Sequence, residues 1–496
     1  MARLLSKSKY LAGTQCSRLL WALTNRPDSI PAPDAITQHV FDQGHLVGEY
    51  AKQLFPRGID IPHDDFMGNI HATSRLLAER RPVFEAGILS GRIYSRVDIL
   101  NPVNKDEWDI IEVKASTSIK GVHIDDVAFQ KYCCEQAGLK IRACKLGFLN
   151  REYVREGDID PAALFKLEDI SSRVGEAGLD IEERVSNMVN VISSRTCPEV
   201  PIGPHCIEPY ECSLRCECWA FLPENSIFDL RGGKTKQFSL FDQGIMSITD
   251  IPDDVALSRQ QKIQKECLMT GRVHIEREEI HRFLDRLEYP LRFLDFETIA
   301  PAIPPYDGMR PYQDLPFQFS LHIVESDESE PAHHPFLAEG KDDPRPRILS
   351  ELQDLLGSQG SIIAYNAGFE ESVLRELVET SPGSADWLQG ILTRMVDLLF
   401  PFTNFHYYNA SQKDTASLKR VLSALTGRGY EEMGIGNGMD ASVAYARIAY
   451  GNATEEENAR VRADLIEYCK LDTEGMIWIV DELRKLCDGP QGRLPL

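Results

Sequence analysis

Five residues in the C-terminal half of the chain have the types and spacing of a two-metal site. Asp295 and Glu297 alternate along LRFLDFETI, which predicts a strand with both carboxylates on one face. Glu370 follows SIIAYNAGF, where a strand is expected to run into a helix. Tyr468 and Asp472 lie one turn apart on a predicted helix. Carboxylates from three separate elements can bind two Mg²⁺ or Mn²⁺ ions about 4 Å apart, an arrangement that hydrolyses phosphodiesters.

The residues of this set have distinct expected roles. All four acids would hold the ions, of which one activates water and the other stabilises the leaving 3′ oxygen. Tyr468 would align the water through a hydrogen bond. Asp397, in RMVDLLFPF, is an alternative acid that we rank below Glu370, because its neighbours indicate a strand and a loop. The competing interpretation is an exposed acidic surface on an acidic protein.

A second candidate site lies on a predicted β-hairpin in the N-terminal half. GRIYSRVDIL and DIIEVKAS indicate two strands joined by a turn, and alternation puts Glu112 and Lys114 on one face. Asp98 lies near the end of the partner strand, and Gln130 lies on a predicted helix downstream. Asp98 and Glu112 would bind Mg²⁺ or Mn²⁺, while Lys114 orients water or neutralises charge on phosphate. Gln130 would position the water. Because the pattern is short, a solvated strand face is the alternative interpretation.

The cysteines form a third candidate site. Of the twelve, four fall in CIEPYECSLRCEC, between Cys206 and Cys218. A disulfide framework is not expected in a large cytoplasmic chain, so crowded thiols indicate a metal or a cluster. Cys206, Cys212 and Cys218 are evenly spaced and, with Cys16, would hold a 4Fe–4S cluster that pins the ends of one domain together. The alternative is a local four-thiolate zinc site, in which Cys216 replaces Cys16.

Composition limits what the chain can be. Its 496 residues are 43% hydrophobic and 26% charged, which indicates a globular protein of two to four domains. Acidic residues outnumber basic ones 76 to 54, and a net charge of −22 excludes nucleic-acid binding through bulk positive charge. Phosphate binding must therefore be local or built around metal ions. No apolar run reaches the roughly 18 residues of a membrane span, and no signal peptide is evident, so we expect a cytoplasmic protein.

The N-terminal pattern resembles the RecB-like PD-(D/E)xK nucleases that carry an iron–sulfur cluster, such as the nucleases of CRISPR adaptation and the AddB-type helicase-nucleases. The resemblance covers about residues 1–220 and rests on Cys16, Asp98, the triplet Glu112-Val113-Lys114, Gln130 and the three late cysteines. That family has a Gly-x-x-x-His or Gly-x-x-x-Glu element on an early helix. The expected helix FDQGHLVGEYAKQLF has His45 and Glu49 after Gly44, at other spacings, and both are candidates for the same site.

The C-terminal order of D-x-E, then N-x-x-F-acid, then Y-x3-D resembles the DnaQ-like (DEDD) 3′–5′ exonucleases of the tyrosine subtype. That resemblance implies a ribonuclease H-like fold. The second acid of that family is usually Asp, whereas this chain has Glu370. Nearly the whole chain also resembles a bacterial family that fuses the two modules, domain of unknown function 2779. Its carrying stretches include LSKSKYLAGTQCSRLLW, AYNAGFE and LIEYCKLDT.

We therefore expect an α/β protein of three parts. Residues 1–225 would form a PD-(D/E)xK restriction-endonuclease-like domain with the cluster, 226–285 a linker region with small elements, and 286–496 a ribonuclease H-like domain. The expected function is metal-dependent hydrolysis of DNA or RNA at two sites. Two alternatives remain open at this point. The protein could be a nucleic-acid-binding or assembly module of a defence or repair complex, with one or both sites inactive. It could also use only the C-terminal site, with the N-terminal domain gripping the substrate.

Overall fold

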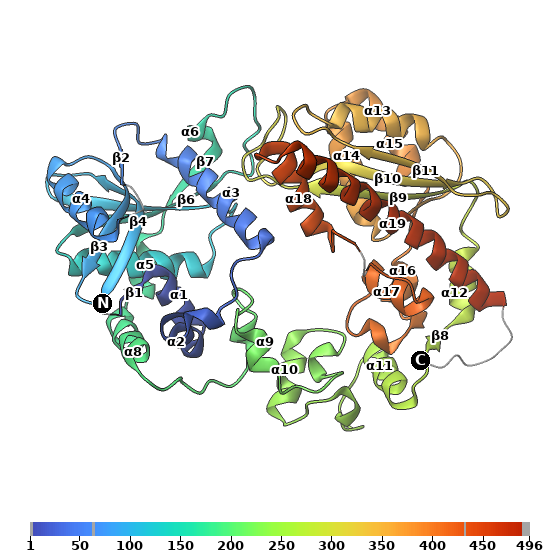
Figure 1. The fold of residues 1–496 in the computed structure, drawn as a ribbon, viewed down its shortest axis with the longest axis horizontal. Coiled ribbons are helices and arrows are strands. Elements are labelled where there is room, and N and C mark those ends of the chain that lie inside the picture. The colour runs from blue at the N-terminus through green and yellow to red at the C-terminus, as the bar shows by residue number, and fades with distance from the viewer. Residues whose placement is uncertain (1–2, 62–64, 431–432, 489–496) are drawn as a thin grey trace. The chain divides into compact units, whose positions relative to one another are not determined.

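The computed structural model describes residues 3–61, 65–430 and 433–488 of a mixed α/β protein (Figure 1). The chain forms two compact units. The first contains residues 1–221 and 301–313, and the second contains 222–300 and 314–496. Among the described helices, none combines the length and the apolar character that crossing a membrane requires.

A seven-stranded sheet forms the core of the first unit. Its order is β2-β3-β4-β5-β6-β7, with β1 paired beside β4. The strands are β1 Leu5–Ser6, β2 Ile59–Asp60, β3 Val83–Ser90, β4 Ile93–Pro102, β5 Glu107–Lys114, β6 Lys140–Leu149 and β7 Phe165–Asp169. The helices are α1 Lys7–Gln15, α2 Ser17–Asn25, α3 Ala35–Lys52, α4 Phe66–Glu79, α5 Gly121–Gln136, α6 Pro161–Leu164, α7 Ser171–Ala177, α8 Ile181–Ser193 and α9 Arg215–Trp219. The predicted hairpin is therefore present as β4 and β5.

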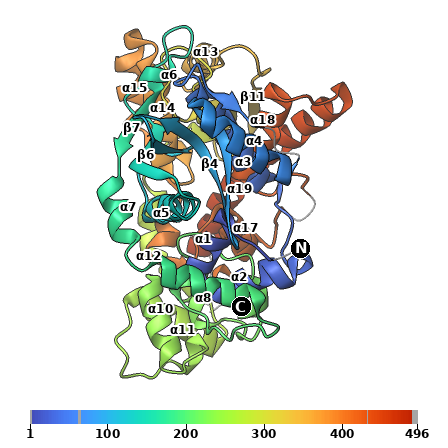
Figure 2. The same ribbon diagram turned by 90° about the vertical axis from the view of Figure 1, so that its left-hand side faces the viewer.

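One edge of β4 is shared by two strands. The end of β4, from Ile99, pairs with antiparallel β5, while its beginning pairs with parallel β1 at Leu5 and Ser6. The sheet therefore forks along this edge of β4: β1 pairs with one part of the edge and β5 with the other. Parallel β5 and β6 are connected by α5, which Figure 2 shows nearly end-on. Tyr10 of α1 is buried and stacks on Phe129 of α5, with ring centroids 4.5 Å apart, so α1 and α5 pack together beside the fork.

A five-stranded mixed sheet organises the second unit, in the order β11-β10-β9-β12-β13. β9 is antiparallel to β10 and parallel to β12. Its strands are β9 Leu291–Ile299, β10 Leu315–Val324, β11 Ala332–Leu337, β12 Ile362–Ala364 and β13 Met395–Asp397. The main helices are α12 Arg277–Leu284, α13 Arg345–Leu355, α14 Ala367–Glu379, α15 Ala385–Leu392, α16 Phe400–Thr403, α17 Leu418–Thr426, α18 Gly438–Tyr450 and α19 Glu455–Asp488. α19 packs along β9 and β10, as Figure 1 shows.

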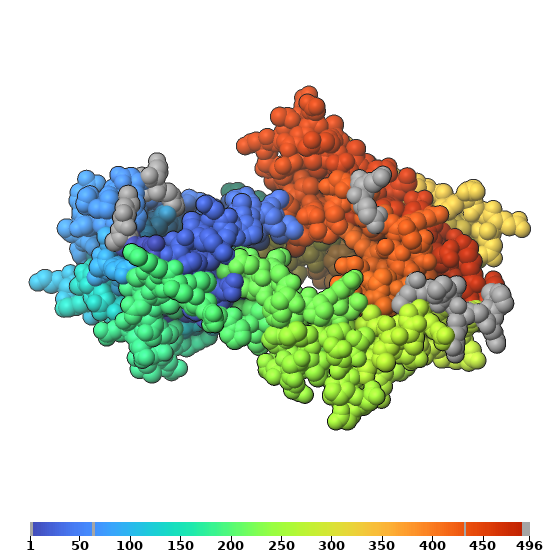
Figure 3. All heavy atoms as spheres, turned by 60° about the horizontal axis from the view of Figure 1, so that its bottom comes forward, coloured from blue at the N-terminus to red at the C-terminus, as the bar shows by residue number. Residues whose placement is uncertain are grey.

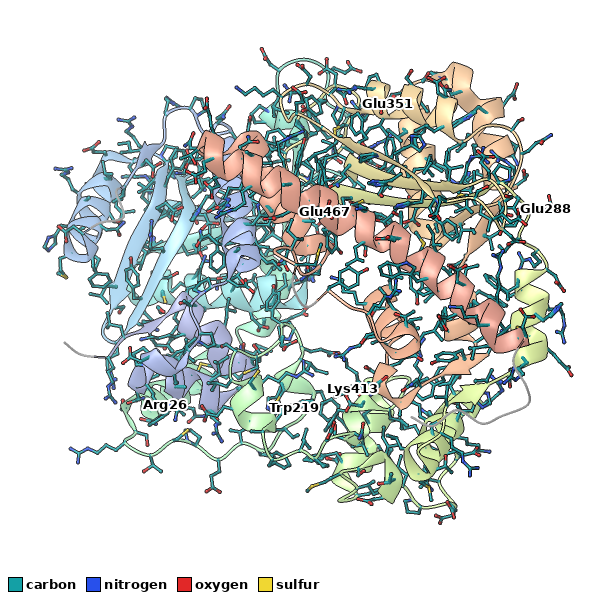
Figure 4. All side chains as sticks on the ribbon, turned by 45° about the vertical axis from the view of Figure 1, so that its right-hand side comes forward. Arg26, Trp219, Glu288, Glu351, Lys413 and Glu467 are labelled. Atoms are coloured by element: carbon teal, nitrogen blue, oxygen red, sulfur yellow. The ribbon has the colours of Figure 1, made fainter. Side chains whose placement is uncertain are left out.

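The region expected to be a linker folds as part of the second unit. It contains α10 Lys234–Asp242, α11 Arg259–Thr270 and β8 His274–Ile275, and β8 pairs with β14 Tyr407–Tyr408. Buried Gln264 donates to the hydroxyl of Tyr408 and to the carbonyl oxygen of Lys413. Lys413, labelled in Figure 4, also pairs with Asp229 at 3.5 Å. The residues between 226 and 285 form one continuous yellow-green part of the surface in Figure 3.

The segment between β9 and β10 folds with the first unit, which the sequence does not predict. Ala302 and Ile303 join an apolar cluster with Val47 and Ala51 of α3. The Arg155 guanidinium donates to the carbonyl oxygens of residues 304 and 305, at 3.0 and 2.6 Å. The hydroxyl of Tyr312 donates to Ala115 O at 2.7 Å, immediately after β5. Residues 301–313 thus brace α3 and the end of β5.

This packing predicts where a substitution in the segment acts. Replacing Ile303 by Ala removes buried apolar volume and should cost about 2 kcal/mol locally. Hydrogen exchange followed by mass spectrometry should then speed up in α3, although residue 303 is close to β9 in the chain. The matched control, Ile363→Ala on β12, should affect peptides of the second sheet instead. Faster exchange confined to β9 and β10 in Ile303→Ala would contradict the packing described.

Candidate metal and catalytic sites

Three predicted carboxylates meet between β9 and α19. Asp295 and Glu297 come from β9, and Asp472 comes from α19. One oxygen from each of the three lies within 4.8 Å of the others. Glu297 and Asp472 are buried, and Asp295 is partly buried. Converging carboxylate oxygens are the ligands that Mg²⁺ and Mn²⁺ prefer, so the second unit has a candidate metal site.

Glu370 completes this acidic group from the first turn of α14. Its side chain is only 1% exposed, and its Oε2 has no hydrogen-bond partner among the described residues. Its charge acts on both Asp295 and Glu297. The alternative acid, Asp397, accepts hydrogen bonds from the backbone of Asn366 and Leu399 through Oδ1, at 3.0 and 2.9 Å. A buried carboxylate oxygen without a donor is costly, which favours Glu370 over Asp397 as a ligand.

Burial raises the pKa of all four acids, and the charges of neighbouring acids of the set raise those of Asp295 and Glu297 further. Burial raises the pKa of Asp295 well above its usual value, and Asp472 and Glu297 raise it further. Burial and the charge of Asp472 raise the pKa of Glu297 to about 8. Burial alone accounts for most of the rise at Glu370, whose pKa is also about 8. Burial raises the pKa of Asp472 to about 6, although Tyr430 and Lys419 oppose the rise.

Two residues of this site were not found from the sequence. Tyr430, just after α17, donates a hydrogen bond to Asp472 Oδ1. Lys419 Nζ lies 4.7 Å from the ring centroid of Tyr430 and 4.9 Å from that of Tyr468. Tyr468 is buried, and burial and Asp472 raise the pKa of its hydroxyl far above the usual range. Neither Tyr430 nor Lys419 has a fixed spacing to an acid, so only the tertiary fold reveals them.

Four of the six residues predicted for the N-terminal site also converge. Lys114 Nζ donates to Glu112 Oε1 at 2.5 Å, and Gln130 Nε2 donates to Glu112 Oε2 at 2.7 Å. Asp98 Oδ2 accepts from the backbone N–H of residue 113 at 2.9 Å. Glu112 and Gln130 are fully buried. The alternation expected along β5 therefore holds.

Asp126 and Lys7 join this group, and the sequence analysis missed both. Asp126 lies one turn before Gln130 on α5 and accepts from Lys114 at 2.7 Å and from Gln130 at 2.9 Å. Lys7, the first residue of α1, donates to Glu112 Oε1 at 2.8 Å. The i,i+4 spacing of Asp126 and Gln130 was a usable signal. Lys7 had none, because more than 100 residues separate it from Glu112 in the chain.

The lysines decide the charge state of this site. Burial opposes ionisation of Glu112, but Lys114 and Lys7 outweigh it and hold its pKa below the usual range. Burial and the charge of Glu112 raise the pKa of Asp98 to about 7. Glu112 and Asp126 together hold the pKa of Lys114 above its usual value despite burial. Glu112 is thus a fixed anion between two fixed cations.

His45 and Glu49 are not brought to this group by the contacts of α3. Both are exposed, and Glu49 pairs with Lys52 at 2.6 Å. The buried face of α3 instead presents Val47 and Ala51 to the core. The predicted helix is therefore present, but its amphipathic pattern directs these two side chains to solvent.

Cys16, Cys206, Cys212 and Cys218 line one pocket in the first unit. Cys16 links α1 to α2, and Cys218 lies on α9. Glu217 of α9 pairs with Arg18 at 2.9 Å and with Arg26, which is labelled in Figure 4. All four are free thiols, and Cys216 is exposed and is not part of the lining. The structure thus places Cys16 in the same lining as the three evenly spaced cysteines.

The four thiols lie close enough for their charges to influence one another. Burial raises the pKa of Cys212 and Cys218, and the other cysteines of the set raise it further. Among the described residues, no three cysteine sulfurs lie within 4.8 Å of one another. Four thiolates around one zinc ion, at Zn–S distances of about 2.3 Å, would be about 3.8 Å apart.

Comparison with known families gives one match. A family model described as a domain of unknown function (DUF2779) matches residues 292–417. That segment contains Asp295, Glu297 and Glu370, and it ends before Tyr468 and Asp472. A search of curated proteins found no match to the chain.

The raised pKa values predict how metal-free protein responds to pH. Unfolding returns Glu297, Glu370 and Asp472 from pKa values of about 8, 8 and 6 to ordinary carboxyl values near 4. Between about pH 4 and about pH 8 the folded protein therefore binds more protons than the unfolded one, so stability falls as pH rises. Thermal unfolding in EDTA should show this decline in the second unit.

Mg²⁺ should oppose the decline, because cations bind the ionised acids and must compete with protons. Asp295→Asn with Glu297→Gln should flatten the pH dependence, because it removes two of the acids whose pKa is raised in the folded protein. The exposed Asp254→Asn serves as a control and should leave the dependence unchanged. Stability that rises steadily through the same pH interval in EDTA would be incompatible with a repelling acidic group.

Proposed function

We propose that the protein is a metal-dependent nuclease whose main active site is the acidic group of the second unit. The observation that carries this proposal is the close approach of Asp295, Glu297 and Asp472, with ligand oxygens within 4.8 Å. The orphaned buried oxygen of Glu370 supports it, because a cation would satisfy that atom. The order of strands and acids further supports a ribonuclease H-like unit of the DnaQ-like type.

The chain's own residues suit phosphodiester hydrolysis in this site. Divalent ions held by the four acids would supply Lewis-acid stabilisation and a water nucleophile at neutral pH. Tyr468 keeps its proton at neutral pH, so its hydroxyl can orient that water by hydrogen bonding. Tyr430 fixes the Asp472 carboxylate through its hydrogen bond. Lys419, held against both tyrosine rings, adds positive charge facing Asp472 and Glu297.

For the first unit we propose a PD-(D/E)xK-like domain that contacts the same substrate. Its support is the convergence of Asp98, Glu112, Lys114 and Gln130 on one end of β5. Gln130 Oε1 is buried without a partner among the described residues and could accept a hydrogen bond from water. The carboxylates here are already bonded to lysines, which favours substrate gripping over hydrolysis as the role of this unit. The proposed partner is DNA or RNA.

We further propose that the four-cysteine pocket holds a 4Fe–4S cluster with a structural role. The pocket joins the α1–α2 junction to the segment from 206 to 218, so a cluster there would tie the two ends of the unit together. Four cysteine thiolates are the usual ligand set of such a cluster. Exposed Cys216 is not needed as a ligand.

Digestion of end-labelled single-stranded DNA and RNA with Mn²⁺ tests the nuclease proposal. Asp295→Asn with Glu297→Gln should lower the rate more than about a hundredfold, because losing metal ligands exceeds the ~10–100-fold loss typical of groups around them. Glu112→Gln with Lys114→Met should retain cleavage and weaken substrate binding. If only Glu112→Gln with Lys114→Met abolished cleavage, the active site would lie in the first unit. An inactive unsubstituted protein that still binds nucleic acid would instead identify a binding module.

Iron and zinc analysis of anaerobically purified protein tests the cluster. We expect a brown, iron-containing protein that loses its iron when Cys16, Cys206, Cys212 or Cys218 is replaced by Ser, because each thiolate is one of four ligands. Cys216→Ser is the matched control and should keep the iron. Bound zinc, or iron loss only in Cys216→Ser, would refute this ligand set.

A further inference from the structure

Lys7 lies among the carboxylates that would hold a cation in the first unit. Its Nζ is 2.8 Å from Glu112 Oε1, 3.7 Å from Asp98 Oδ1 and 3.8 Å from Asp126 Oδ2. Asp98, Glu112 and Asp126 come from three different elements, β4, β5 and α5. A positive charge that approaches acids from three elements takes the place that a divalent ion would need. The mechanism proposed above gives Lys7 no role.

The fold holds Lys7 in this place. It is the first residue of α1, directly after β1, and β1 ends at the fork beside β4. The backbone of α1 is fixed by the cap from Ser6 to Lys9 and by Tyr10, whose buried ring stacks on α5. At its other end, Gln15 donates to the carbonyl oxygens of His205 and Tyr210, in the cysteine-rich segment, at 2.9 and 2.7 Å. The ammonium is therefore positioned by a rigid element rather than by a loop.

Charge balance separates this site from the one in the second unit. Asp98, Glu112 and Asp126 face two ammonium groups, Lys7 and Lys114, so little net negative charge remains. All four oxygens of Glu112 and Asp126 accept a hydrogen bond from Lys7, Lys114 or Gln130. Among the described residues, Lys419 is the cation that lowers the pKa of Glu297 and of Asp472. A divalent ion would thus meet fewer occupied oxygens in the second unit, where Tyr430 donates to Asp472 and Cys469 to Asp295, than in the first.

We propose that Lys7 is an internal cation that occupies the metal position of the N-terminal site, so that a divalent ion enters only by displacing its ammonium from Glu112 and Asp98. The displaced ammonium remains tethered to the first turn of α1, where it can meet an anion such as a substrate phosphate. This inference rests on the proposed metal binding by Asp98 and Glu112, and it makes no claim about hydrolysis. Metal binding, measured without substrate, therefore tests it separately from the nuclease proposal.

The test uses the full-length chain with Asp295→Asn and Glu297→Gln, which removes the competing site. Mn²⁺ binding, followed by the free-ion electron paramagnetic resonance signal, should become at least tenfold tighter when Lys7 is replaced by Met. Lys7→Arg keeps the charge and should show no gain. Lys9→Met, two residues along the same helix, is the matched control and should bind Mn²⁺ as the parent does. Adding Glu112→Gln to Lys7→Met should abolish the gain. Equal or weaker binding in Lys7→Met would overturn the proposal.

A second measurement needs no substitution at Lys7. Lysine acetylation of the same parent protein, read by mass spectrometry, should label Lys7 slowly in EDTA, because its ammonium is held by carboxylates. Mn²⁺ should raise Lys7 labelling severalfold relative to Lys9, since the ion releases the amine. Unchanged or reduced labelling of Lys7 at saturating Mn²⁺ would overturn the proposal, even if Lys7→Met failed to fold.

Discussion

Repulsion between buried carboxylates is the constraint on which both candidate sites depend. Two unit charges about 4 Å apart interact by about 4 kcal/mol at an effective dielectric constant of about 20, so such groups need counter-charges or protons. The first unit supplies counter-charges from its own chain, and Lys7 and Lys114 keep Glu112 ionised. The second unit supplies too few, and its acids retain protons at pH values where free carboxyl groups would be ionised. The first unit therefore keeps Glu112 ionised by counter-charges, although the pKa values of Asp98 and Asp126 beside it are raised, whereas the pKa values of all four acids of the second unit are raised.

Each solution depends on contacts between elements far apart in sequence. In the first unit, one edge of β4 pairs with β1 at its beginning and with β5 at its end. This arrangement brings the start of α1, which follows β1, close to the end of β5. In the second unit, α19 must cross β9 so that Asp472 reaches Asp295 and Glu297. The buried Thr473 supports that crossing through hydrogen bonds with Ser320 and His322 of β10, at 2.7 and 2.8 Å. These uncharged partners fix the helix without adding to the charge of the site.

The sequence predicts those features that follow from strand alternation and helical spacing. It predicts the strand of Asp295 and Glu297 at the residues that form β9, and the pairing of Glu112 with Lys114 on one face of β5. It cannot predict Lys7 or Lys419, because a lysine far along the chain has no periodic relation to the acids it meets. His45 and Glu49 lie on the predicted helix but are exposed, because helical spacing alone does not determine which face of a helix packs against a neighbour. The placement of 301–313 in the first unit also depends on tertiary packing, through Ile303 and Tyr312.

The charge of the whole chain gives the two sites different consequences for a phosphate ligand. A protein of net charge −22 repels nucleic acid at long range, so attraction must be created locally. The second site, with four acids and one nearby lysine, strengthens the repulsion until cations bind, and metal is therefore a condition for substrate approach there. The first site is nearly balanced by its two ammonium groups, so it repels a phosphate less than the second site does. These charge balances agree with the proposed division of roles, in which the first unit contacts the substrate and the second, loaded with metal, cleaves it.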